Sequence, residues 1–400
     1  MTTRRLFLKS SGLAMFGIGA APLWLARAAD APSARKKVLV AVFQRGAVDG
    51  LNLVVPFGEK SYYELRPTIA IPADTVVSLD GFFGLHPALA PLKPVFDANR
   101  LAIIQAVGSP DPTRSHFDAQ DYMESGTPGR KATSDGWLNR ALPALGDAKK
   151  SPVRAVSLGP SLSRAMRGHN DAVAINNLNE FKVQEAGGAA TFESMYASTL
   201  DAALNNTGRE TFDAVKLMQS IQAQPYTAAN GAKYPGGRLG QSLMQIARLI
   251  KADVGLEVAF TDVGGWDTHV NEAGQLANLL GNFGQALAAF YQDLGDRMED
   301  VAVVTMSEFG RTAKENGNRG TDHGHANVMF AFGGAIRGGK VYGEWPGLGP
   351  EQLYENRDLA LTTDFRDVLG ELVVKHLGNG QLGGVFPGYT QPKFRGLIAG

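Results

Sequence analysis

The sequence predicts an α/β fold in which a central, mostly parallel β-sheet is sandwiched by helices. Six unbroken apolar runs are typical of strands buried on both faces of such a sheet. Apolar residues recur every three or four positions over 239–250 and 276–294, which indicates two helices. From 239 to 305 the order is helix, strand, helix, strand, as in βαβ units with right-handed crossovers. The six apolar runs are 38–43, 101–107, 153–158, 256–261, 301–305 and 328–332.

The composition is that of a globular protein and excludes several classes of function. The chain has 400 residues, 44% of them apolar and 20% charged, which is unlike a disordered chain or a polytopic membrane protein. Lys and Arg number 39 and so do Asp and Glu, so no cationic surplus favours nucleic-acid binding. The absence of cysteine excludes disulfides, thiolate ligands and a cysteine nucleophile. Any chemistry must therefore use oxygen and imidazole groups.

The first 28 residues are typical of a twin-arginine signal peptide. Arg4 and Arg5 precede a Phe-Leu-Lys sequence, and an apolar stretch over 12–25 follows. That stretch is shorter than the roughly 20 residues that span a bilayer, and 26–28 (Ala-Arg-Ala) provides a cleavage site. We expect no stable membrane span, export in the folded state by the twin-arginine machinery, and a periplasmic or secreted location. The alternative is a chance arginine pair before a buried helix.

The remaining chain, 29–400, is expected to form a single α/β domain. The stretch 181–237 has weak periodicity and many Ala, Asn and Gln residues, so it is interpreted as a possible helical cap inserted in that domain. We find no repeat of 20 to 50 residues by inspection.

Polar residues collect just after the predicted strands, where ligands bind in open α/β sheets. Four of the seven histidines lie in these loops, with carboxylates one to three residues away. Carboxylate and imidazole groups are ligands of Zn²⁺ and Mn²⁺, and carboxylates are ligands of Ca²⁺. The sequence therefore predicts a divalent metal site. The four histidines are His116, His269, His323 and His325, and the candidate metal ligands are Asp49, Asp267, His269, Glu308, Asp322, His323 and His325.

Individual positions also have simpler interpretations. Asp49 precedes Gly50 and could close a turn, and Glu308 could neutralise Arg311 in a buried ion pair. His376 lies in the predicted helix 365–377, as a surface residue or one of its last turn.

Five sequence motifs together resemble the exported bacterial family called domain of unknown function 1501. This family is grouped with the alkaline phosphatase and sulfatase clan, which implies a sheet flanked by helices and, in active members, one or two metals beside a Ser, Thr or modified Cys nucleophile. By position, Asp49 resembles the clan's first metal carboxylate and His323 or His325 its last histidine. The motifs begin at Arg45, Arg114, Gly265, Ser307 and Thr321.

Two departures from the clan's pattern limit what the resemblance implies. Glu308-Phe309 stands where the clan usually has Asp-His, so we expect one metal ion rather than two. The nucleophile is ambiguous, with Ser115 chosen and Ser109 or Thr113 as alternatives.

The leading hypothesis is a metal-dependent hydrolase that acts on a small anionic substrate, a phosphate or sulfate ester. Arg45, Arg114 or Arg311 would bind the equatorial oxygens, since a guanidinium group fits them in a bidentate manner. The alternative is a non-catalytic envelope binding protein that keeps the fold and one metal and serves a co-exported partner. A third hypothesis, a carbohydrate-active enzyme that uses Asp267 and Glu308 as a carboxylate pair, has less support.

Overall fold

All six predicted strands are present in the computed structural model, which describes residues 35–131, 133–144, 151–178, 217, 219–222 and 225–398. They are buried along most of their length, as their continuous apolar character requires. The strands are β1 (Val38–Gln44), β5 (Leu101–Gly108), β6 (Ala155–Leu158), β8 (Val258–Val263), β9 (Val301–Ser307) and β10 (Asn327–Gly333).

These strands form a mostly parallel sheet with the order β11-β5-β10-β9-β1-β8-β6-β7. Its shorter members are β7 (Val173–Ile175), β11 (Lys340–Tyr342) and β12 (Thr363–Asp364), which pairs with β5. Strand β10 is antiparallel to β5 and β9, and the other pairs are parallel. The carboxyl ends of β1, β5, β8 and β9 therefore share one edge with the start of β10.

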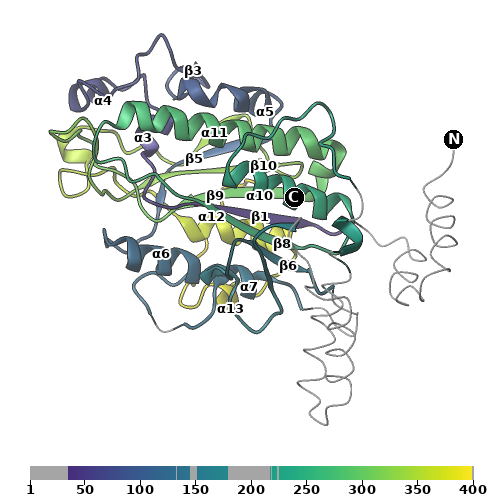
Figure 1. Ribbon diagram of the computed structural model, residues 1–400. Helices are drawn as coiled ribbons and strands as arrows, with labels where there is room; N and C mark the ends of the chain where they lie inside the picture. The colour runs from purple at the N-terminus through teal and green to yellow at the C-terminus, as the bar shows by residue number, and fades with distance from the viewer. Residues whose placement is uncertain are drawn as a thin grey trace, which may run out of the picture. The chain divides into compact units, whose positions relative to one another are not determined.

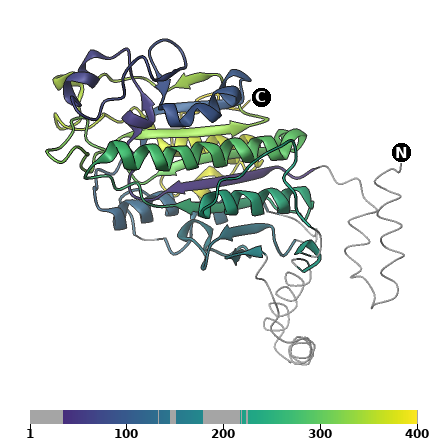
Figure 2. The same ribbon diagram turned by 45° about the horizontal axis from the view of Figure 1, so that its top comes forward.

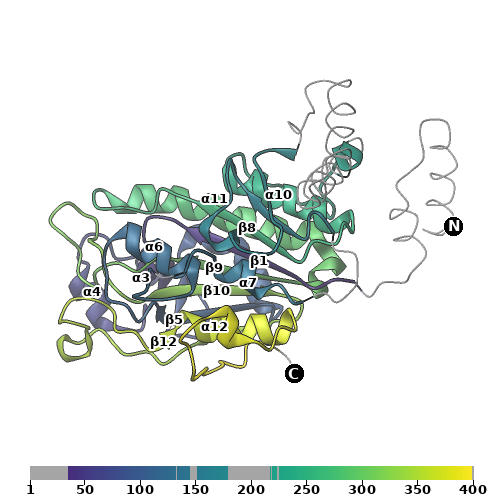
Figure 3. The same cartoon turned by 90° about the horizontal axis from the view of Figure 1, so that it is seen from below.

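Helices cover both faces of the sheet (Figures 1 and 3). Helices α10 (Arg238–Lys251) and α11 (Glu272–Leu294) lie side by side on one face, as Figure 2 shows. Helices α6 (His116–Ser125), α7 (Trp137–Ala141) and α12 (Phe365–Glu371) lie on the other. The predicted fold class, a mostly parallel sheet sandwiched by helices, is confirmed, as are the two helices predicted over 239–250 and 276–294.

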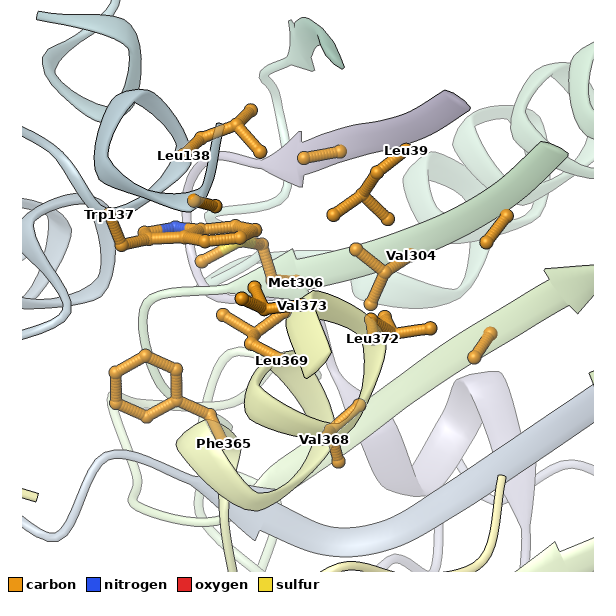
Figure 4. Packing of buried hydrophobic residues seen from close by; sticks show 14 of the residues in the cluster. Leu39, Trp137, Leu138, Val304, Met306, Phe365, Val368, Leu369, Leu372 and Val373 are labelled. Carbon is orange, nitrogen blue, oxygen red and sulfur yellow. The ribbon is translucent and has the colours of Figure 1, made fainter. Parts of the chain in front are cut away.

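The core between the sheet and the second layer of helices is apolar and closely packed (Figure 4). Full burial of a large apolar side chain stabilises the fold by about 1.5–3 kcal/mol. This packing holds the strands rigidly, so the loops at the carboxyl edge start from fixed positions. Its members include Leu39, Val304 and Met306 from the sheet, Trp137 and Leu138 from α7, and Phe365, Val368 and Leu369 from α12.

The remaining elements are short. A small antiparallel sheet has the order β2-β4-β3, with β2 at Val54–Val55, β3 at Val77–Ser78 and β4 at Gly84–Leu85. Short helices are α3 (Gly50–Leu53), α4 (Lys60–Leu65), α5 (Lys93–Asp97) and α13 (Leu382–Val385), a π-helical turn at Leu372–His376, and 3-10 turns at Pro87–Leu92, Arg164–Met166, Gly295–Asp300 and Pro350–Gln352.

The described residues from Lys37 onward form one compact unit. The predicted signal peptide, 1–28, lies outside the described residues, as does most of the predicted cap insertion, 181–237. Across the described part of the chain, no helix is both long and apolar enough to cross a membrane.

Candidate metal centre

Loops from four places in the sequence bring chemically active side chains to the carboxyl edge of the sheet. His116 begins α6 in the segment after β5, and Asp267 and His269 lie in the loop after β8. Glu308 directly follows β9, and His323 lies four residues before β10. The topology thus gathers residues that are up to 207 positions apart in the chain.

Three imidazoles and one carboxylate converge at this edge. The Nε2 atom of His323 lies 3.0 Å from Nε2 of His116 and 3.0 Å from Nε2 of His269. One carboxylate oxygen of Asp267, Oδ1, lies 3.0 Å from Nε2 of His269 and 3.3 Å from Nε2 of His323. The four side chains are 25–47% exposed, so a ligand from solvent can reach them.

The hydrogen bonds of the other ring nitrogens fix how these imidazoles present their lone pairs. Nδ1 of His323 lies 3.0 Å from the carbonyl oxygen of Arg114, which can only accept a hydrogen bond. Nδ1 of His269 lies 3.1 Å from a carboxylate oxygen of Asp322, and Nδ1 of His116 lies 2.8 Å from one of Glu308. Each Nδ1 therefore carries the proton when the ring is neutral, and each Nε2 presents a lone pair to the cluster.

Such converging lone pairs repel one another unless a cation lies among them. One donor atom from each of His116, Asp267 and His323 can be chosen so that all lie within 4.8 Å of one another, and Nε2 of His269 adjoins two of these residues. Zinc–nitrogen bonds of about 2.0–2.1 Å in a tetrahedron separate donor atoms by about 3.3 Å. The donor set and its spacing therefore fit a divalent transition metal.

Glu308 hydrogen-bonds to one histidine of this cluster and orients its ring. Its Oε1 accepts hydrogen bonds of 2.8 Å from Nδ1 of His116, from the backbone N–H of Gly46 and from the side-chain amide of Gln120. Burial raises the pKa of Glu308, but these hydrogen bonds outweigh burial and hold the pKa below its ordinary value. A carboxylate bonded in this way to a ligating histidine orients the ring and raises its basicity.

Arg311 fixes the position of Asp267. Its buried guanidinium donates a 2.6 Å hydrogen bond to Oδ1 of Asp267, and others to backbone carbonyls that include those of Ala47 and Thr321. Burial raises the pKa of Asp267, but the Arg311 charge and hydrogen bond outweigh it, so the pKa lies below its ordinary value. Gly46 has φ +115°, and a Cβ there would lie 2.8 Å from the backbone nitrogen of Asp267, so glycine permits this close approach.

The histidines themselves differ in their affinity for a proton. The hydrogen bond to Glu308 raises the pKa of His116. Burial, followed by the charge of His116, lowers the pKa of His323. The pKa values of these two neighbouring histidines are therefore shifted in opposite directions.

Comparison with known protein families shows which family the chain belongs to. Residues 102–379 match the family described as "Protein of unknown function (DUF1501)". The chain belongs to this family. The resemblance inferred from the five motifs is thus confirmed. No curated protein matches the sequence.

Several solved structures are distantly similar to this DUF1501 chain. They include Ps i-CgsB in complex with k-i-k-neocarrahexaose, at 9% identity and a TM-score of 0.39, covering 86% of this chain and 72% of that one. The PsFucS1 sulfatase from Pseudoalteromonas sp. is 12% identical, with a TM-score of 0.35, covering 94% and 72%. A protein in the alkaline phosphatase superfamily from Vibrio parahaemolyticus is 11% identical, with a TM-score of 0.33, covering 77% and 62%.

Two of the predicted metal ligands lie apart from the cluster in this DUF1501 structure. Asp49 is 1% exposed, and its two oxygens bond to the guanidinium of Arg66 at 2.5 and 3.1 Å. It also caps helix α3 by accepting hydrogen bonds from the backbone of Leu51 and Asn52. His325 is buried and stacks on Tyr354 with ring centroids 4.6 Å apart. Asp49 is placed to stabilise the loop after β1, in agreement with its simpler interpretation as a turn residue.

The predicted arginines have carboxylate partners of their own. Arg45 pairs with Asp262 at 2.6 Å and with Glu124 at 2.9 Å, and Arg114 pairs with Asp358 at 2.6 Å. Arg311 is buried and binds Asp267, as described above. The structure therefore gives all three arginines a part in holding the edge loops.

The other predicted residues lie beside the cluster. Asp322 bonds to Nδ1 of His269, so it supports that ring in the way that Glu308 supports His116. Ser115 is exposed and immediately precedes His116, where its side chain does not cap α6.

The candidate ligands chosen from the sequence did not include His116, which the structure places in the cluster. This histidine was counted among the histidines of the edge loops, and that location was the available signal. Its hydrogen bond to Glu308 joins residues 192 positions apart, which no local spacing reveals.

Proposed function

We propose that this protein is a metal-dependent hydrolase of phosphate or sulfate esters that binds one divalent ion. The ligands are His116, His269 and His323 through Nε2, and Asp267 through a carboxylate oxygen. One observation carries the proposal: each imidazole has its Nδ1 bonded to an acceptor, so that the Nε2 lone pairs converge beside Asp267. An arrangement that is unfavourable when empty is favourable around a cation.

The donor set narrows the choice of ion. Calcium takes six to eight oxygen ligands, and three imidazoles do not meet that requirement. Imidazole suits zinc and other transition metals, so Zn²⁺ is the first choice and Mn²⁺ the second.

The chemistry assigned to the site follows from these groups. A bound divalent ion supplies a Lewis acid that polarises an ester oxygen. Ser115 is the proposed nucleophile because it is exposed and adjoins His116, with Ser109 and Thr113 as alternatives. Arg114 is 27% exposed and lies next to Ser115, so it is the arginine best placed to reach a substrate oxygen, although it would have to exchange Asp358 for that oxygen.

A second candidate function is a non-catalytic metal protein of the envelope. The pairing of Arg45, Arg114 and Arg311 with carboxylates favours it, because a site that binds anionic esters gains from guanidinium groups that are free to bind oxygen. Under either function, we propose export by the twin-arginine machinery on the basis of the leader sequence.

The test is hydrolysis of p-nitrophenyl phosphate and p-nitrophenyl sulfate by metal-depleted protein before and after adding Zn²⁺ or Mn²⁺. We expect the metal to restore activity in the natural protein and in His169→Gln, which changes an exposed histidine outside the cluster. We expect His269→Ala to lose at least about 100-fold in kcat/KM, because loss of a ligand costs several kcal/mol. Hydrolysis that persists in His269→Ala would contradict the assigned site, and bound metal without hydrolysis would favour the second candidate.

A further inference from the structure

A buried polar network centred on Glu272 joins the two loops that carry most of the metal ligands. Glu272 is the first residue of α11 and is fully buried. Its Oε2 accepts hydrogen bonds from the hydroxyl of Thr268 at 3.1 Å and from the hydroxyl of Thr321 at 2.7 Å. Thr268 separates Asp267 from His269 in the chain.

Thr321 lies two residues before the third ligating histidine, His323. The backbone N–H of Thr321 also donates to the carbonyl of Thr268 at 3.2 Å, so the two loops are in direct contact. A single carboxyl oxygen thus receives one hydroxyl from each ligand loop. Because both hydroxyls are on fully buried residues, each needs this acceptor.

The other oxygen of the Glu272 carboxyl group, Oε1, also has hydrogen-bond partners. Its Oε1 accepts a 2.9 Å hydrogen bond from the side-chain amide of Asn52, whose oxygen accepts one of 2.7 Å from Tyr62. The Glu272 carboxyl also hydrogen-bonds to Asp49, which is paired with Arg66. Burial, followed by the charge of Asp49, raises the pKa of Glu272 well above its ordinary value. The raised pKa favours the protonated carboxyl group of Glu272, and the hydrogen bond to Asp49 suits that form.

We infer that Glu272 is a positioning residue that sets the metal affinity of the centre by holding the 267–269 loop and the 321–323 loop in one geometry. The inference rests on the metal binding of the proposed function and not on ester hydrolysis. Without the carboxyl group, Thr268 and Thr321 lose their common acceptor. The donor atoms of Asp267, His269 and His323 would then sample wider separations.

A second buried glutamate offers a matched control. Glu371 is also fully buried, and it accepts hydrogen bonds from the backbone N–H groups of Arg395, Gly396 and Ile398. These contacts hold the C-terminal segment and involve neither ligand loop. Loss of Glu371 should weaken the fold without changing the metal centre.

The experiment measures the zinc affinity of the folded protein by competition with a chromophoric chelator. We expect Glu272→Ala to weaken zinc binding by at least about tenfold, the effect typical of groups that orient metal ligands. We expect Glu272→Gln to stay within about threefold of the natural protein, because an amide resembles the carboxyl group in shape and keeps an oxygen for the threonine hydroxyls. Glu371→Ala should bind zinc with unchanged affinity.

Two further variants keep the inference testable if Glu272→Ala does not fold. Thr268→Val and Thr321→Val each remove one hydroxyl while leaving Glu272 in place, and each should weaken zinc binding by about threefold or more. Unchanged affinity in Glu272→Ala, or in both threonine variants, would overturn the inference. Zinc binding without ester hydrolysis would contradict the proposed function alone, whereas a natural protein that binds no zinc would contradict both.

Discussion

Two polar clusters lie at the same edge of the sheet and contain similar residue types. They differ in whether each hydrogen-bond acceptor faces a donor. In the metal centre, the Nε2 atoms of His116, His269 and His323 face one another as acceptors, and the side chains are partly exposed. In the network around Glu272 and Asp49, each carboxyl oxygen faces a donor, and the side chains are buried.

The difference shows which feature distinguishes a binding site from a structural network. Carboxylates are present in both, so residue type alone does not separate them. In the candidate metal centre, hydrogen bonds at Nδ1 orient the histidine rings, while the Nε2 lone pairs face one another. The network is marked by charges and hydroxyls that satisfy one another within the protein. Substitutions in the two regions should therefore have different consequences.

The largest effect is expected in the buried network around Glu272 and Asp49. Asp49→Ala leaves the charge of the fully buried Arg66 without its partner, which should lower the free energy of unfolding by about 3–5 kcal/mol. Urea unfolding measures this loss as a lower midpoint. The control is Asp97→Ala, which breaks an exposed pair with Lys93 and should cost less than about 1 kcal/mol. Equal losses in the two variants would show that the buried network is not tighter than a surface pair.

A smaller effect is expected at Glu308, a buried carboxylate that hydrogen-bonds to a histidine of the candidate metal centre. Glu308→Gln removes the charge that orients His116 and should weaken metal affinity by about 10- to 100-fold. Chelator competition measures the change. Glu257→Gln is the matched control, because Glu257 is buried and paired with Arg154 just before β8 begins, at the other end of that strand. If both variants bind metal equally well, Glu308 does not support the centre.

The smallest effect concerns a histidine that the fold encloses. His376 is 5% exposed and lies 3.0 Å from the carbonyl of Val38 through Nε2, and burial lowers its pKa to about 4. The unfolded chain takes up this proton first as the pH falls below about 6.5, so stability is lost between there and pH 4. Between pH 7 and 5 we expect this group to remove about 1–2 kcal/mol of stability.

Urea unfolding of His376→Gln at both pH values checks this expectation. The variant should lose less stability than the natural protein over that interval, whereas His169→Gln, at an exposed position, should behave like the natural protein. The same loss in the natural protein and in His376→Gln would show that the enclosed histidine does not titrate in this way. His376 lies in the last helical turn, as one of its two interpretations predicted, and it is buried there against the start of β1 and not on the surface.

The fold class could be predicted because strands buried on both faces have continuous apolar sequences. Each of the six predicted strands is present, with ends within a few residues of the prediction. The sequence also places three of the histidines of the edge loops together, since residues that follow parallel strands meet at one edge. The roles of individual carboxylates are not readable from the sequence. Asp49 lies in the expected loop, but its partner is Arg66, 17 residues later in the turn after α4, and no periodic pattern links them. Glu308 likewise hydrogen-bonds to His116, which comes from a distant helix start, and no local pattern in the sequence links the two.

The most direct measurement is the metal content of the natural protein and of His323→Ala, determined by elemental mass spectrometry after zinc loading and removal of excess metal. His323 is the proposed ligand whose Nε2 contacts those of both other histidines. We predict close to one zinc ion per natural chain and none retained by His323→Ala. A natural chain that retains no metal, or a variant that retains as much as the natural chain, would contradict the metal centre.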